Sequence, residues 1–130
     1  MRIIAKDGDY SVYRFEADAP LPEELSRTAG FLSVTRTDRE LSVVCASDAV
    51  HGAGTEEGGW TLWEVEGPLD FGMIGVLSSI TVPLAAAGIS VFAVSTYDTD
   101  YILWKLDKAA AAVRALRAAG FEVEGSARFP

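Results

Sequence analysis

An internal repeat constrains the fold of this chain more than any other feature of its sequence. Residues 10–16 and 60–66 are rich in aromatic and β-branched residues, and each stretch carries an aromatic residue at its first and fourth positions. Residues 30–37 and 88–97 both begin with a glycine and continue as an apolar strand pattern. Two β-α-β-β units are therefore the simplest interpretation, and a chain of 130 residues is long enough for both.

In the first half we expect a β-hairpin, a short helix and a second hairpin. Asp7-Gly8 can adopt the positive φ angles of a tight turn, and Pro22 followed by two glutamates is typical of a helix start. We expect this degenerate unit to occupy residues 1–50, followed by a glycine-rich linker over residues 51–59. The predicted strands cover residues 2–5, 10–16, 31–36 and 41–45.

A helix is predicted in the second half between residues 76 and 87. Gly88 is suited to the left-handed position that follows a helix. Pro83 has no N–H to donate, so we expect a kink or a lost hydrogen bond near residues 79–83. The apolar residues recur at intervals of three and four and share one helical face: Val76, Leu77, Ile80, Leu84 and Ala87.

The second half also carries a further helix, which the first half lacks. Asp107 is expected to cap the start of this helix, and Gly120 is expected to end it. Residues 121–124 alternate as a closing strand. Residues 60–125 therefore predict a ferredoxin-like βαββαβ unit in an α+β fold, preceded by the degenerate βαββ unit. The apolar stripe of the further helix is Ala109, Ala112, Val113, Leu116 and Ala119.

The charge of the chain excludes two classes of partner. Nineteen acidic against eleven basic residues give a formal net charge of −8, whereas nucleic acids and anionic membranes are bound by clustered Lys and Arg. The most apolar stretch, residues 73–94, is interrupted by Pro83 and Gly88 and does not predict a membrane span. The N-terminus turns polar at Lys6, unlike a signal peptide, so we expect a cytoplasmic protein.

Few residues are available for catalysis or metal binding. The single histidine, His51, lies in a glycine-rich segment that would not hold its side chain in place, and the single cysteine, Cys45, lies in an apolar strand pattern. A zinc site needs three or four such ligands, and the chain has no Gly-Lys-Ser/Thr phosphate loop. We therefore expect no metal, no cofactor and no enzyme activity. A buried carboxylate pair is the one catalytic arrangement that stays open.

The strongest candidate for a site is the segment that leads into the predicted helix. Residues 66–75 contain three glycines, which either supply positive φ angles for a tight crossing or let the backbone approach a bound group. The polar run 95–100 follows an apolar strand and is either a hairpin turn or a second wall of the site. Taken together, helix N–H groups would bind the carboxylate of an α-amino acid, and Asp70 or Asp100 would bind its ammonium group.

Several motifs of the chain resemble a known family. In the second half they are Gly75-Val76-Leu77-Ser78-Ser79-Ile80, Pro83-Leu84-Ala85 and the stretch from Ala87 to Leu103, which includes Ser95-Thr96-Tyr97-Asp98-Thr99-Asp100. With these residues the chain resembles the ACT domain of the aspartate kinase and CASTOR-like group over most of residues 60–125, and the proline inside the helix is part of that pattern. In the first half, Leu21-Pro22, Ser33 to Thr37 and Glu40 to Val44 are similar to the degenerate N-terminal unit of small stand-alone members that have two ACT-like units.

The resemblance implies a regulatory, allosteric module that binds an amino acid, usually at an interface between paired domains. Where the arginine-sensing relatives can present an acid in the loop, this chain has Met73, so Asp100 is the clearest local anion and the identity of the amino acid stays open. The ligand contacts of those relatives carry over to the strand-to-helix loop and the following strand end: Met73, Ile74, Gly75, Val76, Leu77, Thr96, Tyr97 and Asp100.

Three functions remain in competition. The first is a non-catalytic regulatory module with a small amino-acid ligand, acting as a homodimer or on a partner enzyme. The second is an interaction module without a ligand that only dimerises, because a four-stranded sheet with one helix-covered face leaves edges and a face to be covered. The third is a small enzyme that uses buried carboxylates. We favour the first of these hypotheses.

Overall fold

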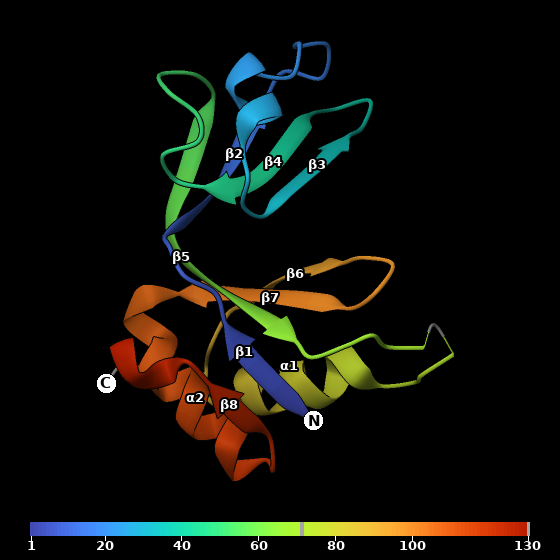
Figure 1. Ribbon diagram of the computed structural model, residues 1–130, viewed down its shortest axis with the longest axis vertical. Coiled ribbons are helices and arrows are strands. Elements are labelled where there is room, and N and C mark those ends of the chain that lie inside the picture. Colours follow the sequence, from blue (N-terminus) through green and yellow to red (C-terminus); the bar gives the residue numbers. More distant parts are fainter. Residues whose placement is uncertain (71, 130) are drawn as a thin grey trace. The chain divides into compact units, whose positions relative to one another are not determined.

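The computed structural model describes residues 1–70 and 72–129 and divides the chain into two compact units (Figure 1). The larger unit comprises Met1–Asp7 together with the chain from Trp60 onward, and the smaller unit comprises Gly8–Gly59. The first seven residues, which we expected in the N-terminal unit, therefore belong to the larger unit. Within the described residues, no helix is both long enough and apolar enough to cross a membrane.

The smaller unit is a sheet with the strand order β3-β4-β2-β5 and a short 3₁₀ helix. Both β2 and β3 pair with β4 in antiparallel register, which confirms the predicted hairpin of residues 31–45. The buried side chains that form its core are Tyr13, Phe15, Leu25, Leu41, Val43, Cys45 and Val50. Its elements are β2 (Tyr10–Phe15), η1 (Glu23–Arg27), β3 (Leu32–Arg36), β4 (Leu41–Ala46) and the first residues of β5 (Thr55–Val65).

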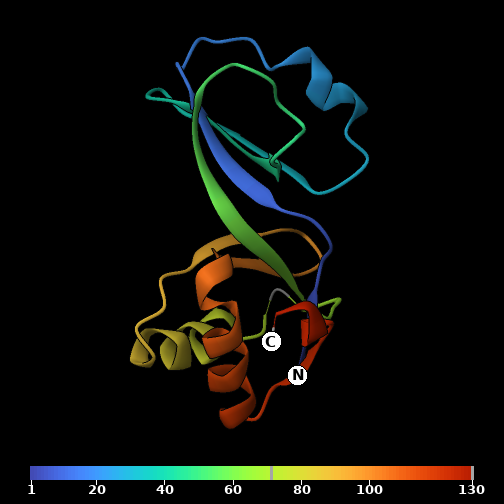
Figure 2. The same ribbon diagram turned by 90° about the vertical axis from the view of Figure 1, so that its left-hand side faces the viewer.

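The larger unit is a five-stranded sheet with the order β6-β7-β5-β1-β8, and two helices cover one of its faces (Figure 2). From Trp60 onward its elements follow the order β-α-β-β-α-β, so the predicted α+β, ferredoxin-like fold class is confirmed. The elements are β1 (Arg2–Ala5), β5 up to Val65, α1 (Val76–Ala86), β6 (Phe92–Ser95), β7 (Asp100–Lys105), η2 (Leu106–Lys108), α2 (Ala109–Ala118), β8 (Glu122–Glu124) and η3 (Ser126–Arg128).

The first strand of the chain occupies an unexpected position in the larger unit. β1 lies between β5, to which it is antiparallel, and β8, to which it is parallel. The expected hairpin between residues 2–5 and 10–16 is therefore wrong. Ile3 is fully buried, whereas the Arg2 guanidinium reaches Glu66, Glu122 and Glu124 at 3.1–3.4 Å. A buried apolar contact and an exposed ion-pair network together hold β1 in this position.

Both helices of the larger unit end as their glycines predict. After α1, Gly88 has a φ of 76°, its N–H donates to Ala85, and the Ile89 N–H donates back to Leu84 at 2.9 Å. This is the pattern of a Schellman cap, and the burial of Ile89 completes it. The helix runs unbroken through Pro83. The expected strand at residues 88–97 is shorter, because only Phe92–Ser95 pairs with β7.

The start of α2 differs from the prediction. Asp107 lies inside the 3₁₀ turn η2, and α2 begins after Lys108 without a side-chain cap. The negative charge of Asp107 still precedes the helix, where it opposes the positive end of the helix dipole. Four of the five residues in the predicted apolar stripe are buried, whereas Ala119 lies beyond the last helical residue and is exposed.

The core of the larger unit is built around two tryptophans. The rings of Trp63 and Trp104 stack with their centroids 4.7 Å apart, and both side chains are fully buried. The Trp63 indole N–H donates to the Thr61 hydroxyl, which in turn donates to the Trp104 carbonyl. Ile80 and Leu84 from α1 and Leu116 from α2 belong to the same buried cluster.

The predicted linker is partly a strand, because β5 begins at Thr55. The Glu56 carboxylate accepts hydrogen bonds from Ser11 at 2.6 Å and from the Tyr13 hydroxyl at 3.2 Å. The Ser11 hydroxyl also lies 2.7 Å from the Ser47 hydroxyl. Burial and the bond to Glu56 raise the pKa of Tyr13, so the donor keeps its proton. These side-chain bonds hold a segment whose glycines alone would favour a flexible connector.

Gly54 and Gly52 form a matched pair for testing the packing of this segment. Both have positive φ angles, of 77° and 69°, but an added Cβ would lie 2.7 Å from the Phe15 ring at Gly54 and would meet open space at Gly52. Alanine at either position costs about 1–2 kcal/mol of backbone strain. Overpacking against Phe15 should add about 1–3 kcal/mol for Gly54→Ala alone. Urea unfolding followed by circular dichroism checks this, and equal losses for the two variants would contradict it.

Candidate functional site

Hydrogen bonds to β1 and to the β6–β7 turn hold the segment that joins β5 to α1. Its first residue, Glu66, donates its N–H to the Arg2 carbonyl of β1 at 2.9 Å. Three residues later, the Leu69 N–H donates to the Asp98 carbonyl at 2.6 Å. The buried Thr99 hydroxyl donates to the Val65 carbonyl at 2.5 Å. The segment and the β6–β7 turn therefore form one hydrogen-bonded assembly.

A close backbone approach explains one glycine of the segment. A Cβ on Gly67 would lie 3.0 Å from the Thr99 Cβ and 3.1 Å from the Asp98 carbonyl oxygen. The turn that it contacts is closed by Thr96, whose N–H and hydroxyl both donate to the Thr99 carbonyl at 2.9 Å. Tyr97, at the tip of this turn, is 82% exposed.

The N-terminus of α1 carries no cap. Gly75 occupies the cap position with φ 79° and ψ 11°, and the first turn contains no acidic residue. The hydroxyls of Ser78 and Ser79 donate backward to the carbonyls of Gly75 and Val76 and so do not cap the N–H groups. Within the part of the chain that the structure describes, the first N–H groups of the helix are thus available to an external acceptor, at the positive end of the helix dipole.

A hollow of about 220 Å³ lies between this helix start and the β6–β7 turn. Pockets for drug-sized ligands are larger, about 300–1,000 Å³, so this hollow suits a small metabolite. Three carboxyl groups belong to its wall, those of Asp70, Asp98 and Asp100, and the described part of its lining contains no basic residue. The described residues that line it are Leu69, Asp70, Met73, Val76, Ser95, Thr96, Tyr97, Asp98, Thr99 and Asp100.

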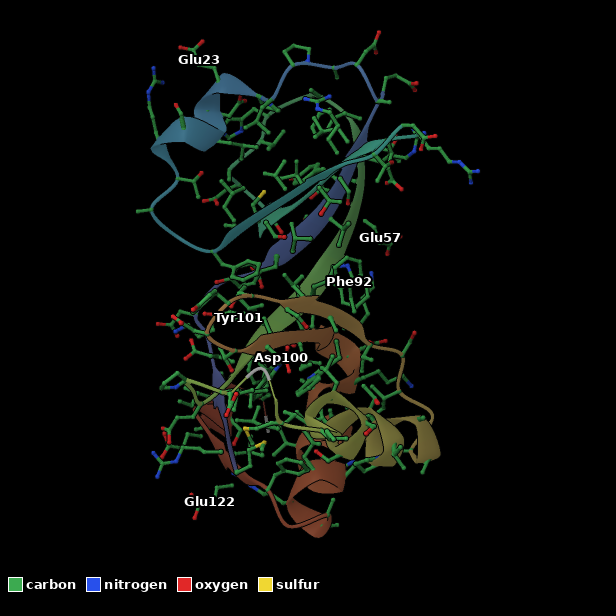
Figure 3. The ribbon with its side chains drawn as sticks, turned by 90° about the vertical axis from the view of Figure 1, so that its right-hand side faces the viewer. Glu23, Glu57, Phe92, Asp100, Tyr101 and Glu122 are labelled. Carbon is green, nitrogen blue, oxygen red and sulfur yellow. The ribbon has the colours of Figure 1, made fainter. Side chains whose placement is uncertain are left out.

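Asp70 and Asp100 differ in the contacts that they make within the protein. Asp70 accepts the Gly72 N–H on its carboxylate at 2.9 Å and the Met73 N–H on its carbonyl at 2.9 Å, so it shapes the loop. Asp100, labelled in Figure 3, begins β7 opposite Ser95 and is half-buried. Among the described contacts, no cation pairs with the Asp100 carboxylate. Of these two acids, Asp100 is therefore the more available to a positively charged ligand group.

Six of the nine residues that the sequence suggested lie in the hollow: Asp70, Met73, Val76, Thr96, Tyr97 and Asp100. The other three lie elsewhere. Ile74 is 97% exposed, Gly75 contributes its backbone to the helix start, and Leu77 packs against the core. The helical period explains the position of Leu77, because residues adjacent in a helix point about 100° apart, whereas Ile74 and Gly75 precede the first helical residue.

Four lining residues were not among the suggested contacts: Leu69, Ser95, Asp98 and Thr99. The polar run 95–100 was the signal for three of them, since it contains every residue of the β6–β7 turn. The fourth, Leu69, lines the hollow because its N–H binds the Asp98 carbonyl, a pairing that no sequence pattern indicates.

The described residues contain no group of three or more His, Cys, Asp or Glu side chains that could hold a metal ion. Cys45 is buried in the core of the smaller unit, and burial, with smaller effects of Asp48 and Glu56, raises its pKa to about 11. His51 is exposed, and its backbone N–H lies 3.4 Å from the Glu24 carboxylate. Neither side chain faces the hollow beside α1.

Comparisons with known proteins place these observations in a family. A family model for the ACT domain matches residues 56–118, and a second model, for an N-terminal domain, matches residues 8–52. A search of curated proteins found no match. The chain is 32% identical to a protein of Agobacterium tumefaciens whose crystal structure has a TM-score of 0.87, with 94% of this chain and 90% of that chain covered.

More distant structures share the fold. A Vibrio cholerae protein of unknown function, described as a possible transport protein, is 22% identical with a TM-score of 0.70 over 91% of this chain and 88% of that chain. The aspartokinase alpha and beta subunits are 15% identical with a TM-score of 0.61 over 92% and 97%. Clostridium acetobutylicum aspartate kinase is 11% identical with a TM-score of 0.68, covering 90% of this chain and 34% of that chain.

The environment of Cys45 yields a prediction about its reactivity. Only the thiolate is nucleophilic, and a thiol whose pKa is about 11 forms very little thiolate at pH 8. A thiol reagent should leave native Cys45 unmodified at pH 8 and modify one thiol per chain in 6 M guanidinium, as absorbance or mass measures. Rapid modification of the native protein, without loss of its circular dichroism, would show instead that Cys45 is an accessible nucleophile.

Proposed function

Because the chain is an ACT-domain protein, we propose that it is a non-catalytic regulatory module that binds a small amino acid in the hollow beside α1. One observation carries this proposal. The uncapped helix start and the available Asp100 carboxylate border the same small hollow. Two poles of opposite sign on one small hollow match the carboxylate and ammonium groups of a zwitterion.

The charges that line the hollow favour a ligand whose ammonium group faces the β6–β7 turn and whose carboxylate faces the start of α1. Asp98 and Asp100, at the β6–β7 turn, would repel a carboxylate placed beside them, and they attract an ammonium group there. At the opposite side, the N–H groups at the start of α1 donate to the carboxylate, and the helix dipole stabilises its negative charge. Val76, Met73 and Leu69 then supply apolar contact for a short side chain.

A second function, an interaction module that dimerises without a ligand, is favoured by a separate observation. Several apolar residues near the helix and the β6–β7 turn are exposed: Ile74 at 97%, Tyr97 at 82% and Val82 at 64%. α1 contains no charged residue, so two copies of a chain with net charge −8 could meet there without placing like charges together. A homodimer formed at this surface, or a partner enzyme bound to it, is compatible with ligand binding as well.

Calorimetry and melting curves with each of the twenty amino acids test the proposed function. A ligand present at 100 times its Kd adds about 2.7 kcal/mol to the free energy of unfolding, which raises Tm by several degrees. Asp100→Asn should weaken binding about tenfold or more, because a hydrogen bond to a charged group contributes about 1.5–3 kcal/mol.

Asp107→Asn is the matched control, because it makes the same change of charge in the same unit on an exposed residue outside the hollow. This variant should bind as the parent chain does. Absence of heat and of a Tm shift with every amino acid at millimolar concentration would contradict the proposal. Equal losses for the two variants would show that overall charge, and not the hollow, determines binding.

A further inference from the structure

A second hollow, of about 270 Å³, lies between α2 and the C-terminal turn η3. It shares no lining residue with the hollow beside α1 and has the opposite charge. Its described lining contains two arginines and no acid. The lining residues are Ala110, Val113, Arg114, Arg117, Ser126, Ala127 and Phe129.

Arg117 is held in a defined position. Its Nη2 donates to the Val123 carbonyl and to the Ser126 hydroxyl, each at 3.0 Å. Both hydrogens of that nitrogen are thereby used, and three of the five guanidinium N–H donors remain. A cation fixed in this way loses little side-chain entropy when it binds an anion.

Arg114 lies three residues before Arg117, so the two side chains project from neighbouring positions on the exposed face of α2. Within the described part of the chain, no carboxylate forms an ion pair with Arg114. Two guanidinium groups on one rim can share a carboxylate or a phosphate, whose planar or tetrahedral oxygens fit their N–H donors.

The remaining wall of this hollow is apolar and fixed by the core. Val113 is buried, and the Phe129 ring packs against Trp63 with the ring centroids 5.4 Å apart. Ala110 and Ala127 are small and leave the space open. A ligand that fits here has an apolar body for this wall and an oxyanion for the two arginines.

We propose that this hollow is a second binding site, for a small organic acid whose carboxylate or phosphate is joined to an apolar group. The −8 charge of the chain disfavours anions over most of the surface, so a pair of arginines without acids is a local exception. A role in stabilising the C-terminal end of the helix dipole accounts for the charge of the arginines, but not for the apolar hollow beside them. The inference does not depend on amino-acid binding beside α1.

Titration of the full chain with benzoate, phenyl phosphate and inorganic phosphate, followed by amide NMR, tests this site. Benzoate or phenyl phosphate should shift the amide signals of Val113, Arg114 and Ser126 along a saturable curve. Inorganic phosphate should bind at least about tenfold more weakly, since burial of an apolar group contributes about 1.5–3 kcal/mol. Comparison of the two aromatic probes decides whether the carboxylate or the phosphate is preferred.

Arg114→Gln is the informative variant, because Arg117 also supports the C-terminal turn through its hydrogen bonds to Val123 and Ser126. This variant should weaken binding of both aromatic probes about tenfold, and Arg39→Gln, an identical change in an exposed turn of the smaller unit, should leave it unchanged.

Non-saturating shifts, or an unchanged Kd in Arg114→Gln, would overturn the proposal. Equal affinity for inorganic phosphate would overturn the apolar part of it. Asp100→Asn should not alter these titrations, which separates this site from the amino-acid site.

Discussion

The position of β1 is the constraint on which the rest of the larger unit depends. By pairing with both β5 and β8, the first residues of the chain determine where β5 ends and where the segment toward α1 begins. The Arg2 carbonyl accepts the Glu66 N–H, and the neighbouring Val65 carbonyl accepts the Thr99 hydroxyl. The end of β5 is thus tied to β1 on one side and to the β6–β7 turn on the other. This double attachment places the acids of the turn opposite the start of α1.

Local patterns predicted those parts of the fold that local interactions determine. The apolar stripe of α2, the Schellman cap at Gly88 and the hairpin of β3 and β4 each follow from residues close together in the chain. The partner of β1 could not be predicted in the same way. Residues 2–5 followed by Asp7-Gly8 indicate a hairpin just as well as a strand that pairs with strands far away in the sequence. The same reason explains Thr55–Gly59, which becomes a strand because Glu56 meets Ser11 and Tyr13 across the sheet.

The two segments that the sequence suggested for the site line one hollow, but the sequence did not indicate which side chains face inward. Leu77 follows the inward-facing Val76 by one position, where the helix turns the side chain away, and Ile74 lies exposed in the loop before the helix. Leu69 was missed because a single backbone hydrogen bond, to Asp98 in a distant segment, brings it to the hollow. Contacts of this kind require the register between two segments, and register is a property of the whole sheet.

The bare start of α1 is explained by how the rest of that helix is stabilised. A capping side chain would contribute about 1 kcal/mol, and an acid in the first turn a further few tenths, yet α1 has neither. Its stability comes instead from the Schellman cap at its other end and from Ile80 and Leu84, which are fully buried in the core. The N-terminal N–H groups can therefore remain available for a ligand while the helix stays formed. Because no side chain caps the start of α1, the N–H groups at the edge of this hollow remain as donors for a bound carboxylate.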